Sequence, residues 1–142
     1  IRNDYRNRIP YFEFVAAVHP DACVSSSVQI GVGTVIMAGV TVNANCEIGE
    51  HCIVNTNSSI DHDSLLLDFS SIGPGVNLAG NVSLGQLSYV GIGSTVSHNI
   101  VIGYNTVIGG SSFVNKNVGD NELGYFSPYR KVRKRKLGEK YL

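Results

Sequence analysis

Hydrophobic residues recur along the chain with a period of six. Stepping by six from Val18 to Val114 meets seventeen positions, and every one is Val, Ile or Leu. A helix places apolar residues three and four apart and a half-buried strand places them two apart, so a strict six fits neither. It predicts an all-β fold, a parallel β-helix in which each hexad forms one flat face and three faces close a triangular coil. Seventeen hexads give five to six coils, stacked about 4.8 Å apart.

Two further positions of the hexad are restricted, counting the aliphatic residue as position one. Position five holds nothing larger than Ile, as expected for a second inward-facing side chain in a narrow interior. Position two is rich in Gly and Asn, which tolerate tight backbone corners best, so we expect the corners of the triangle there. Glycines at position two fall into three columns whose members lie eighteen residues apart, so that corner stacks over corner. The columns are Gly31 and Gly49, then Gly85 and Gly103, then Gly73, Gly91 and Gly109.

The ends of the chain lie outside the repeat. We divide the chain into a lead-in at 1–17, the β-helix at 18–119, and a C-terminal cap with a basic tail at 120–142. A solenoid has to cover its last coil, which makes capping the simplest role for the C-terminal end. The 142 residues leave no room for a second catalytic domain.

Charge is balanced overall, but seven of the eleven Lys and Arg residues lie at 130–140. Such a run can bind RNA, anionic lipid or phosphate, and is more often a solvated tail, so we expect no nucleic-acid partner.

The chain has no apolar run of membrane-spanning length and no recognisable signal peptide, so we expect no membrane insertion and a cytoplasmic location. Cys23, Cys46 and Cys52 match no zinc-ligand spacing and are expected to be free, buried thiols, with no metal bound.

The stretch I-D-H-D-S at 60–64 places one histidine between two aspartates. Either Asp61 or Asp63 could accept the N–H of the His62 ring, which would fix the tautomer and favour the imidazolium that forms on proton uptake. Periodicity alone leaves two interpretations open, an exposed turn histidine and a catalytic one. His98 occupies the same hexad position two coils later, about 10 Å away, which is too far for both to bind one metal ion unless an adjacent subunit intervenes.

The interior of such a β-helix is filled with side chains, so we expect any site on the outside. It would lie along a face or between two helices packed side by side. A closed trimer is the natural assembly for a three-sided prism, and the groove between neighbours is where we expect a site first.

The segment Val54–Val82, V-N-T-N-S-S-I-D-H-D-S-L-L-L-D-F-S-S-I-G-P-G-V-N-L-A-G-N-V, resembles the core of the hexapeptide-repeat sugar O- and N-acetyltransferases. Sialic-acid O-acetyltransferase and the UDP-4-amino-sugar N-acetyltransferase typify that family. The upstream runs V-H-P-D-A and G-T-V-I-M-A-G-V look similar, and the match extends from about Phe14 to Val118. The resemblance implies a left-handed β-helix and a homotrimer with sites between subunits. It also implies a cytoplasmic enzyme of cell-surface polysaccharide biosynthesis, which moves acetyl from acetyl-CoA to an amine or hydroxyl of a sugar or nucleotide sugar.

Transferred residue by residue, the resemblance makes His62 the general base and Asp63 the acidic neighbour that raises its basicity. It places Asn55, one hexad earlier, near the acceptor, and we assign Asp61 to substrate binding as well. Backbone N–H groups near Gly73 or Gly80 are candidates to donate to the oxyanion that develops during acyl transfer. Acetyl-CoA would contact Ser71, Gly80, Ile92 and Gly110.

Several features depart from the family pattern. Ser71 stands where many members have a second histidine, and Phe126 replaces a glycine near the C-terminal end. Leu67 replaces the usual Gly or Asn at position two, which predicts a distorted corner one hexad past His62. Members often carry a nucleotide-sugar-binding domain before the first coil, and residues 1–8 show no Gly-rich fingerprint of one.

Two other functions therefore stay open. Ser71 and Phe126 leave room for a catalytically degenerate β-helix that binds or scaffolds. A zinc-dependent lyase resembling the hexapeptide-type carbonic anhydrases is less favoured, because the closely spaced histidines of that family are absent here.

Overall fold

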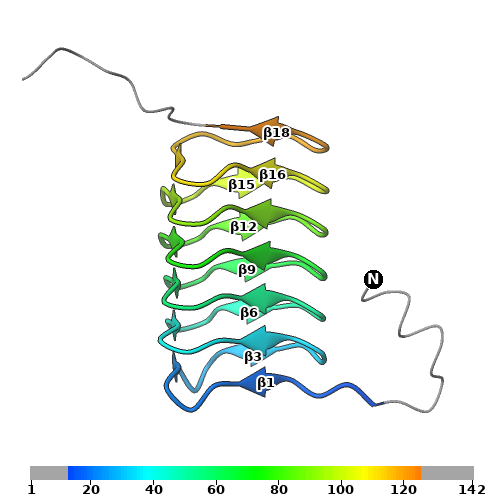
Figure 1. Ribbon diagram of the computed structural model, residues 1–142, viewed down its shortest axis with the longest axis vertical. Coiled ribbons are helices and arrows are strands. Elements are labelled where there is room, and N and C mark those ends of the chain that lie inside the picture. Colours follow the sequence, from blue (N-terminus) through cyan, green and yellow to red (C-terminus); the bar gives the residue numbers. More distant parts are fainter. Residues whose placement is uncertain (1–12, 126–142) are drawn as a thin grey trace, which may run out of the picture.

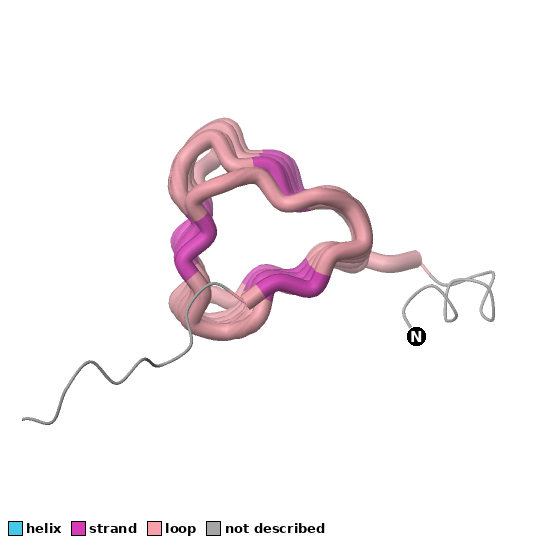
Figure 2. The backbone as a smooth tube through the Cα atoms, turned by 90° about the horizontal axis from the view of Figure 1, so that it is seen from above, coloured by secondary structure: helices cyan, strands magenta, loops and turns pink. Residues whose placement is uncertain are grey.

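The computed structural model describes residues 13–125 of the chain; residues 1–12 and 126–142 lie outside the described part. The described residues form a triangular prism of short strands, about six coils high (Figure 1). Viewed down the long axis, the coils superimpose on one triangle with a strand on each side (Figure 2). The predicted fold, a left-handed parallel β-helix, is confirmed.

Every strand is two residues long, and the strands stack into three parallel sheets, one on each side of the triangle. Sheet A contains β1 (Ala17–Val18), β4 (Val35–Ile36), β7 (Ile53–Val54), β10 (Ser71–Ile72), β13 (Tyr89–Val90), β16 (Val107–Ile108) and β18 (Leu123–Gly124). Sheet B contains β2 (Cys23–Val24), β5 (Thr41–Val42), β8 (Ser59–Ile60), β11 (Asn77–Leu78), β14 (Thr95–Val96) and β17 (Phe113–Val114). Sheet C contains β3 (Gln29–Ile30), β6 (Glu47–Ile48), β9 (Leu65–Leu66), β12 (Ser83–Leu84) and β15 (Val101–Ile102).

The aliphatic residue at position one is the second residue of its strand in all seventeen hexads, and its side chain points into the prism. From Ile36 onward these side chains are buried, because each is covered by the equivalent residue of the next coil. Val18 is 45% exposed, since it lies in the first coil, at one end of the stack.

Position five is the second inward position, as predicted, and it is buried from Thr34 onward. At several of these positions a hydroxyl links two coils, whereas the Ser58 and Ser112 hydroxyls donate to a carbonyl in their own turn. Ser88 Oγ donates to the Gly103 carbonyl at 2.6 Å and accepts the Thr106 N–H at 2.8 Å. Because both hydrogen-bonding roles are filled, the core can hold serine without leaving a buried polar atom unmatched.

The corners lie at a different hexad position from the predicted one. The residues with positive φ occupy position four, among them Asn45 at 60°, Asp63 at 57° and Leu87 at 63°. Glycine at position two has another cause, the close approach of the next coil. A Cβ on Gly31 would lie 2.5 Å from the carbonyl carbon of Gly49. Glycine is therefore favoured at position two because a side chain would collide with the next coil. At position four it is favoured because the backbone has positive φ.

The predicted distortion at Leu67 is also wrong. Its N–H donates to the Leu84 carbonyl at 2.9 Å, and its own carbonyl accepts the Ser70 N–H at 3.2 Å. The turn that begins at Asn55 makes the same bond, from Ser58 N–H to the Asn55 carbonyl at 3.2 Å. Leucine is tolerated at position two because φ is not positive there and the side chain extends outward, where it is 41% exposed.

The segment that we assigned to the cap begins with one more strand. β18 adds to sheet A beside β16, with Val107 opposite Leu123, and the Tyr125 ring lies beside Gly109. Phe126 and the basic run at 130–140 lie outside the described residues.

Candidate active site

His62 lies in the turn that follows β8, at the corner where sheet B gives way to sheet C. Its side chain is 58% exposed on the outside of the prism. Residues eighteen apart stack along this corner, so Gly80 and then His98 follow His62 along the axis. The histidine is therefore accessible to a ligand, and its neighbours come from its own turn and from the coils on either side.

Asp63 holds the imidazole. His62 Nδ1 lies 2.7 Å from Asp63 Oδ2, so the carboxylate accepts the Nδ1–H and leaves Nε2 as the basic nitrogen. This hydrogen bond is the main cause that raises the pKa of His62, and the charge of Asp61 adds to it. The same bond lowers the pKa of Asp63, with a second contribution from Asn45. The pair has the geometry of a general base with an orienting carboxylate.

Asp61 has a different role from Asp63. Its Oδ1 accepts the backbone N–H of His62 at 2.9 Å and the side-chain N–H of Asn43 at 2.8 Å. These bonds lower its pKa, that from Asn43 most strongly. Asp61 thus fixes the turn, and Asp63 is the aspartate that reaches the ring.

Two asparagines from the coil below complete the cluster, and we did not predict them. Asn43 Nδ2 donates to Asp61 Oδ1, and Asn45 Nδ2 donates to Asp63 Oδ1 at 3.2 Å. Each stands eighteen residues before its aspartate. That spacing was readable in the sequence once the coil length was known.

Gly80, in the coil above, lies against the imidazole of His62. A Cβ at this residue would fall 2.7 Å from both Cε1 and Nε2 of His62. Its carbonyl accepts the Asn99 N–H at 3.1 Å, whereas its own N–H has no acceptor among residues 13–125. A backbone donor is therefore available beside the basic nitrogen.

The remaining predicted residues lie elsewhere. Asn55, Ile92 and Gly110 line the corner between sheets A and B, where a Cβ on Gly110 would lie 3.0 Å from Ile92 Cγ2. Ser71 opens β10, on the adjoining face of sheet A. The Asn55 side-chain oxygen accepts the Thr56 N–H at 2.8 Å. Within one chain, sheet B separates this second group from His62, Asp61, Asp63 and Gly80.

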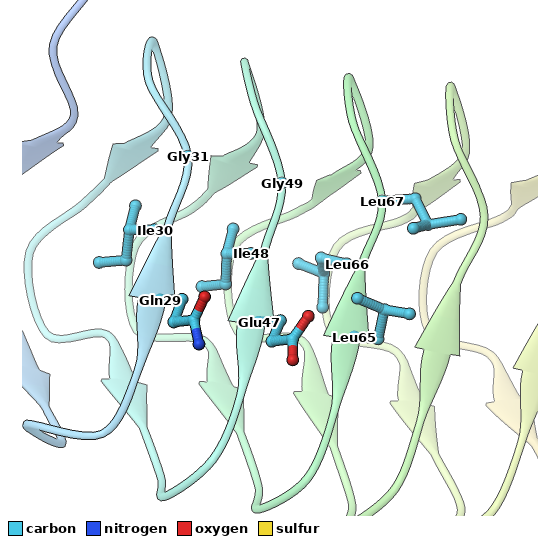
Figure 3. A pocket seen from close by; sticks show the side chains of 9 residues that line it. All are labelled: Gln29, Ile30, Gly31, Glu47, Ile48, Gly49, Leu65, Leu66 and Leu67. Atoms are coloured by element: carbon cyan, nitrogen blue, oxygen red, sulfur yellow. The ribbon is translucent and has the colours of Figure 1, made fainter.

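Neither of two outer hollows contains a predicted site residue. One, of about 350 Å³, lies on the face of sheet C beside Gln29, Glu47 and Leu65 (Figure 3). The other, of about 300 Å³, lies on sheet A around Ala17 and Met37. The candidate site around His62 thus lies on an exposed corner, outside both of these hollows.

Three other potentially reactive side chains, those of His51, Cys46 and Cys52, are buried in the protein. His51 is buried, with its ring stacked on Phe69 at 5.1 Å and edge-on to Phe14 at 4.7 Å. Cys46 and Cys52 are buried free thiols, as predicted, and burial raises the pKa of each. Cys23 is free but exposed, so its predicted burial is wrong; it lies in the first coil, at the end of the stack. In the part of the chain that the structure describes, no group of three or more His, Cys, Asp or Glu residues could hold a metal ion. The same residues include no helix able to cross a membrane.

No protein-family model matches the chain. The chain is 30% identical to the GDP-perosamine N-acetyltransferase of Escherichia coli O157:H7 over 78 residues. This alignment covers 55% of the chain and 35% of the relative. The chain spans about a third of that curated relative.

Solved structures give a longer match. The GDP-perosamine N-acetyltransferase of Caulobacter crescentus, in complex with CoA and GDP-perosamine as a histidine variant, is 36% identical with a TM-score of 0.84. The match covers 87% of this chain and 59% of that one. The acetyltransferase domain of PglB from Neisseria gonorrhoeae, in complex with acetyl coenzyme A, is 33% identical with a TM-score of 0.84, over 87% and 61% of the two chains. The resemblance to hexapeptide-repeat sugar acetyltransferases is therefore confirmed.

Proposed function

We propose that this chain forms the β-helix of an enzyme that transfers acetyl from acetyl-CoA to the amine of a nucleotide-linked amino sugar. The observation that carries the proposal is the bond between His62 Nδ1 and Asp63 Oδ2, which leaves Nε2 beside Gly80 on an exposed corner. The solved relatives support the substrate class, because they are 33–36% identical and hold CoA, acetyl-CoA or GDP-perosamine.

The chemistry needs no covalent enzyme intermediate. The sugar amine attacks the thioester carbonyl carbon while Nε2 of His62 takes the proton that the amine loses. The tetrahedral intermediate then collapses, the C–S bond breaks, and the proton on His62 passes to the departing CoA thiolate. Asp63 keeps the ring in the Nδ1–H tautomer and stabilises the imidazolium between the two steps.

Gly80 is our candidate for the oxyanion donor. Its N–H has no acceptor among residues 13–125 and lies beside the imidazole, where the carbonyl oxygen of the thioester would develop negative charge. A backbone donor held rigidly by a coil can stabilise that charge without reorganising.

The acetyl-CoA subsite would come from a second subunit. Ile92 is 59% exposed, and Gly110 presents bare backbone beside it, which suits an acyl chain and its thioester. These residues and Ser71 are separated from His62 by the width of sheet B. We therefore place each site in a groove of a homotrimer, where the A–B corner of one subunit faces the B–C corner of the next. Asn55 and Asp61 would then contact the acceptor from the two sides.

The family resemblance implies a role in cell-surface polysaccharide biosynthesis in the cytoplasm. We place the reaction there, with acetyl-CoA as co-substrate and no metal.

An acceptor panel tests the proposal. Free thiol is measured as the protein is incubated with acetyl-CoA and GDP- or UDP-linked 4-amino sugars, free amino sugars or sialic acid. We expect acetyl-CoA-dependent thiol release with a nucleotide-linked 4-amino sugar, and an acetylated product of matching mass. Turnover only with a hydroxyl acceptor would contradict N-transfer. Absence of both turnover and thermal stabilisation by acetyl-CoA would favour a degenerate scaffold.

A further inference from the structure

We propose that Asn45, in the coil below, is a positioning residue for the histidine base and acts on His62 through Asp63. The inference rests on the proposed function and adds a residue to it. The side chain of Asn45 hydrogen-bonds to Asp63, the residue that holds the imidazole, so the aspartate is the route by which it can act on His62.

Asp63 has two oxygens with separate partners. Oδ2 lies 2.7 Å from His62 Nδ1, and Oδ1 accepts the Asn45 side-chain N–H at 3.2 Å. Both side chains of the His62–Asp63 pair are more than half exposed. An exposed carboxylate held by one bond turns easily toward water, whereas a second anchor on its other oxygen restricts that rotation.

Asn45 is itself held from beneath. Its backbone N–H donates to Ser27 Oγ at 2.9 Å, one coil further down the same corner. It has φ of 60°, a left-handed conformation that asparagine tolerates better than most residues. A continuous set of hydrogen bonds thus rises through three coils, from Ser27 through Asn45 and Asp63 to the His62 ring.

Other asparagines make similar bonds between coils without reaching a catalytic group. Asn43 donates to Asp61, whose same oxygen accepts the His62 backbone N–H, so this bond supports the turn. Asn105 donates to Asn121 at 2.9 Å, on the corner between sheets C and A. Asn105 also has positive φ, 49°, which makes it a matched control for Asn45.

Among residues 13–125, the charged groups that act on His62 are two aspartates. Asp61 and Asp63 belong to its own turn; the coil below presents Asn43 and Asn45, and the coil above presents Gly80. None of the last three titrates. His98 stands two coils along the same corner. A change at Asn45 can therefore reach the protonation of His62 through Asp63.

The test compares Asn45→Gly with Asn105→Gly, because glycine accepts positive φ without strain and both variants lose one bond between coils. We expect Asn45→Gly to lower kcat by about tenfold, the size expected for one lost hydrogen bond to a charged acceptor. Without Asn45, the Asp63 carboxylate turns away from the ring more often, and its bond to His62 is weakened. Because that bond raises the pKa of His62, the acidic limb of kcat/KM moves to lower pH in this variant. Asn105→Gly lowers the melting temperature to a similar degree and leaves kcat and the limb unchanged.

A double-mutant cycle separates positioning from general damage. In an Asp63→Gly background, Asn45→Gly causes no further loss of kcat if it acts only through Asp63. A further tenfold loss there, or equal pH profiles for Asn45→Gly and Asn105→Gly, overturns the proposal.

NMR titration of the His62 ring gives a readout that needs no turnover. We expect Asn45→Gly to lower the ring pKa relative to the wild type, and Asn105→Gly to leave it in place. If the wild type transfers no acetyl group, the proposed function fails while the titration still tests the coupling. An unchanged ring pKa in Asn45→Gly refutes the coupling whatever the activity.

Discussion

At the scale of single residues, His62 depends on groups from three coils. Asp63 from its own turn holds Nδ1, Asn45 from the coil below anchors Asp63, and Gly80 from the coil above leaves space for the ring. An aspartate on each side of a histidine is ambiguous in sequence. In the structure Asp63, at position four with φ of 57°, is the aspartate whose carboxylate reaches the ring, while Asp61 accepts the His62 backbone N–H.

The pH dependence of the reaction follows from the His62–Asp63 pair. If His62 is the base of the proposed transfer it works in its neutral form, so we expect kcat/KM to rise as pH passes the His62 pKa, which Asp63 and Asp61 raise above the ordinary histidine value. In Asp63→Asn we expect the acidic limb at lower pH and a plateau about tenfold lower or more, because the bond to a charged partner is lost. A pH profile of both proteins checks this. A limb at the same pH in the variant would mean that Asp63 does not tune the base.

Gly80→Ala tests the space beneath the ring. The added methyl would lie 2.7 Å from Nε2 and Cε1, so the imidazole has to move away from the backbone donor. We expect roughly a 100-fold loss of kcat, a loss typical of a displaced catalytic group, with the melting temperature little changed. Activity near that of the wild type would show that the ring is not held against Gly80 during the reaction.

At the scale of the strand and turn, the hexad determines which side chains enter the core. The side chains at positions one and five were predictable, because burial in a narrow interior directly limits their size and polarity. No other constraint is needed to explain the residues found there. The left-handed position four was hidden, because His51, Phe69 and Leu87 occupy it beside the expected Gly and Asn. There the packing of stacked coils outweighs the local preference of the residue.

Leu66 and Leu67 give an adjacent pair for testing this assignment. Leu66 is fully buried in β9 and Leu67 is 41% exposed. We expect Leu66→Ala to lower the free energy of unfolding by about 2–5 kcal/mol, and Leu67→Ala to change it by no more than about 0.5 kcal/mol. Denaturant unfolding of the two variants measures both. Similar losses would mean that the outer side chain at position two is covered by another part of the protein.

At the scale of the whole molecule, the candidate residues divide between two corners. His62, Asp61, Asp63 and Gly80 lie at the B–C corner, and Asn55, Ile92 and Gly110 lie at the A–B corner. The eighteen-residue frame alone implies this division, because 62 and 80 share one place in the coil, and 92 and 110 share another. Which faces meet in an assembly depends on the outer surfaces of complete subunits, so periodicity could not predict it.

Subunit complementation tests whether a site needs two chains. We pair His62→Ala, which lacks the base, with Gly110→Trp, whose indole would block the proposed acetyl-CoA contact. Each variant alone is expected to be inactive. Mixed oligomers regain measurable activity, because some interfaces combine the intact corner of each. If mixtures formed by co-refolding stay inactive, both halves of the site belong to one chain.

The central claim, that His62 is the base of an acetyl transfer, is tested most directly by comparing His62→Ala with His98→Ala. Both residues are exposed and occupy the same hexad position on the same corner, two coils apart. With acetyl-CoA and the preferred amino-sugar acceptor, we expect His62→Ala to lower kcat by at least about 100-fold, and His98→Ala to leave it unchanged. Equal activity of the two variants, with both folded, would contradict the account.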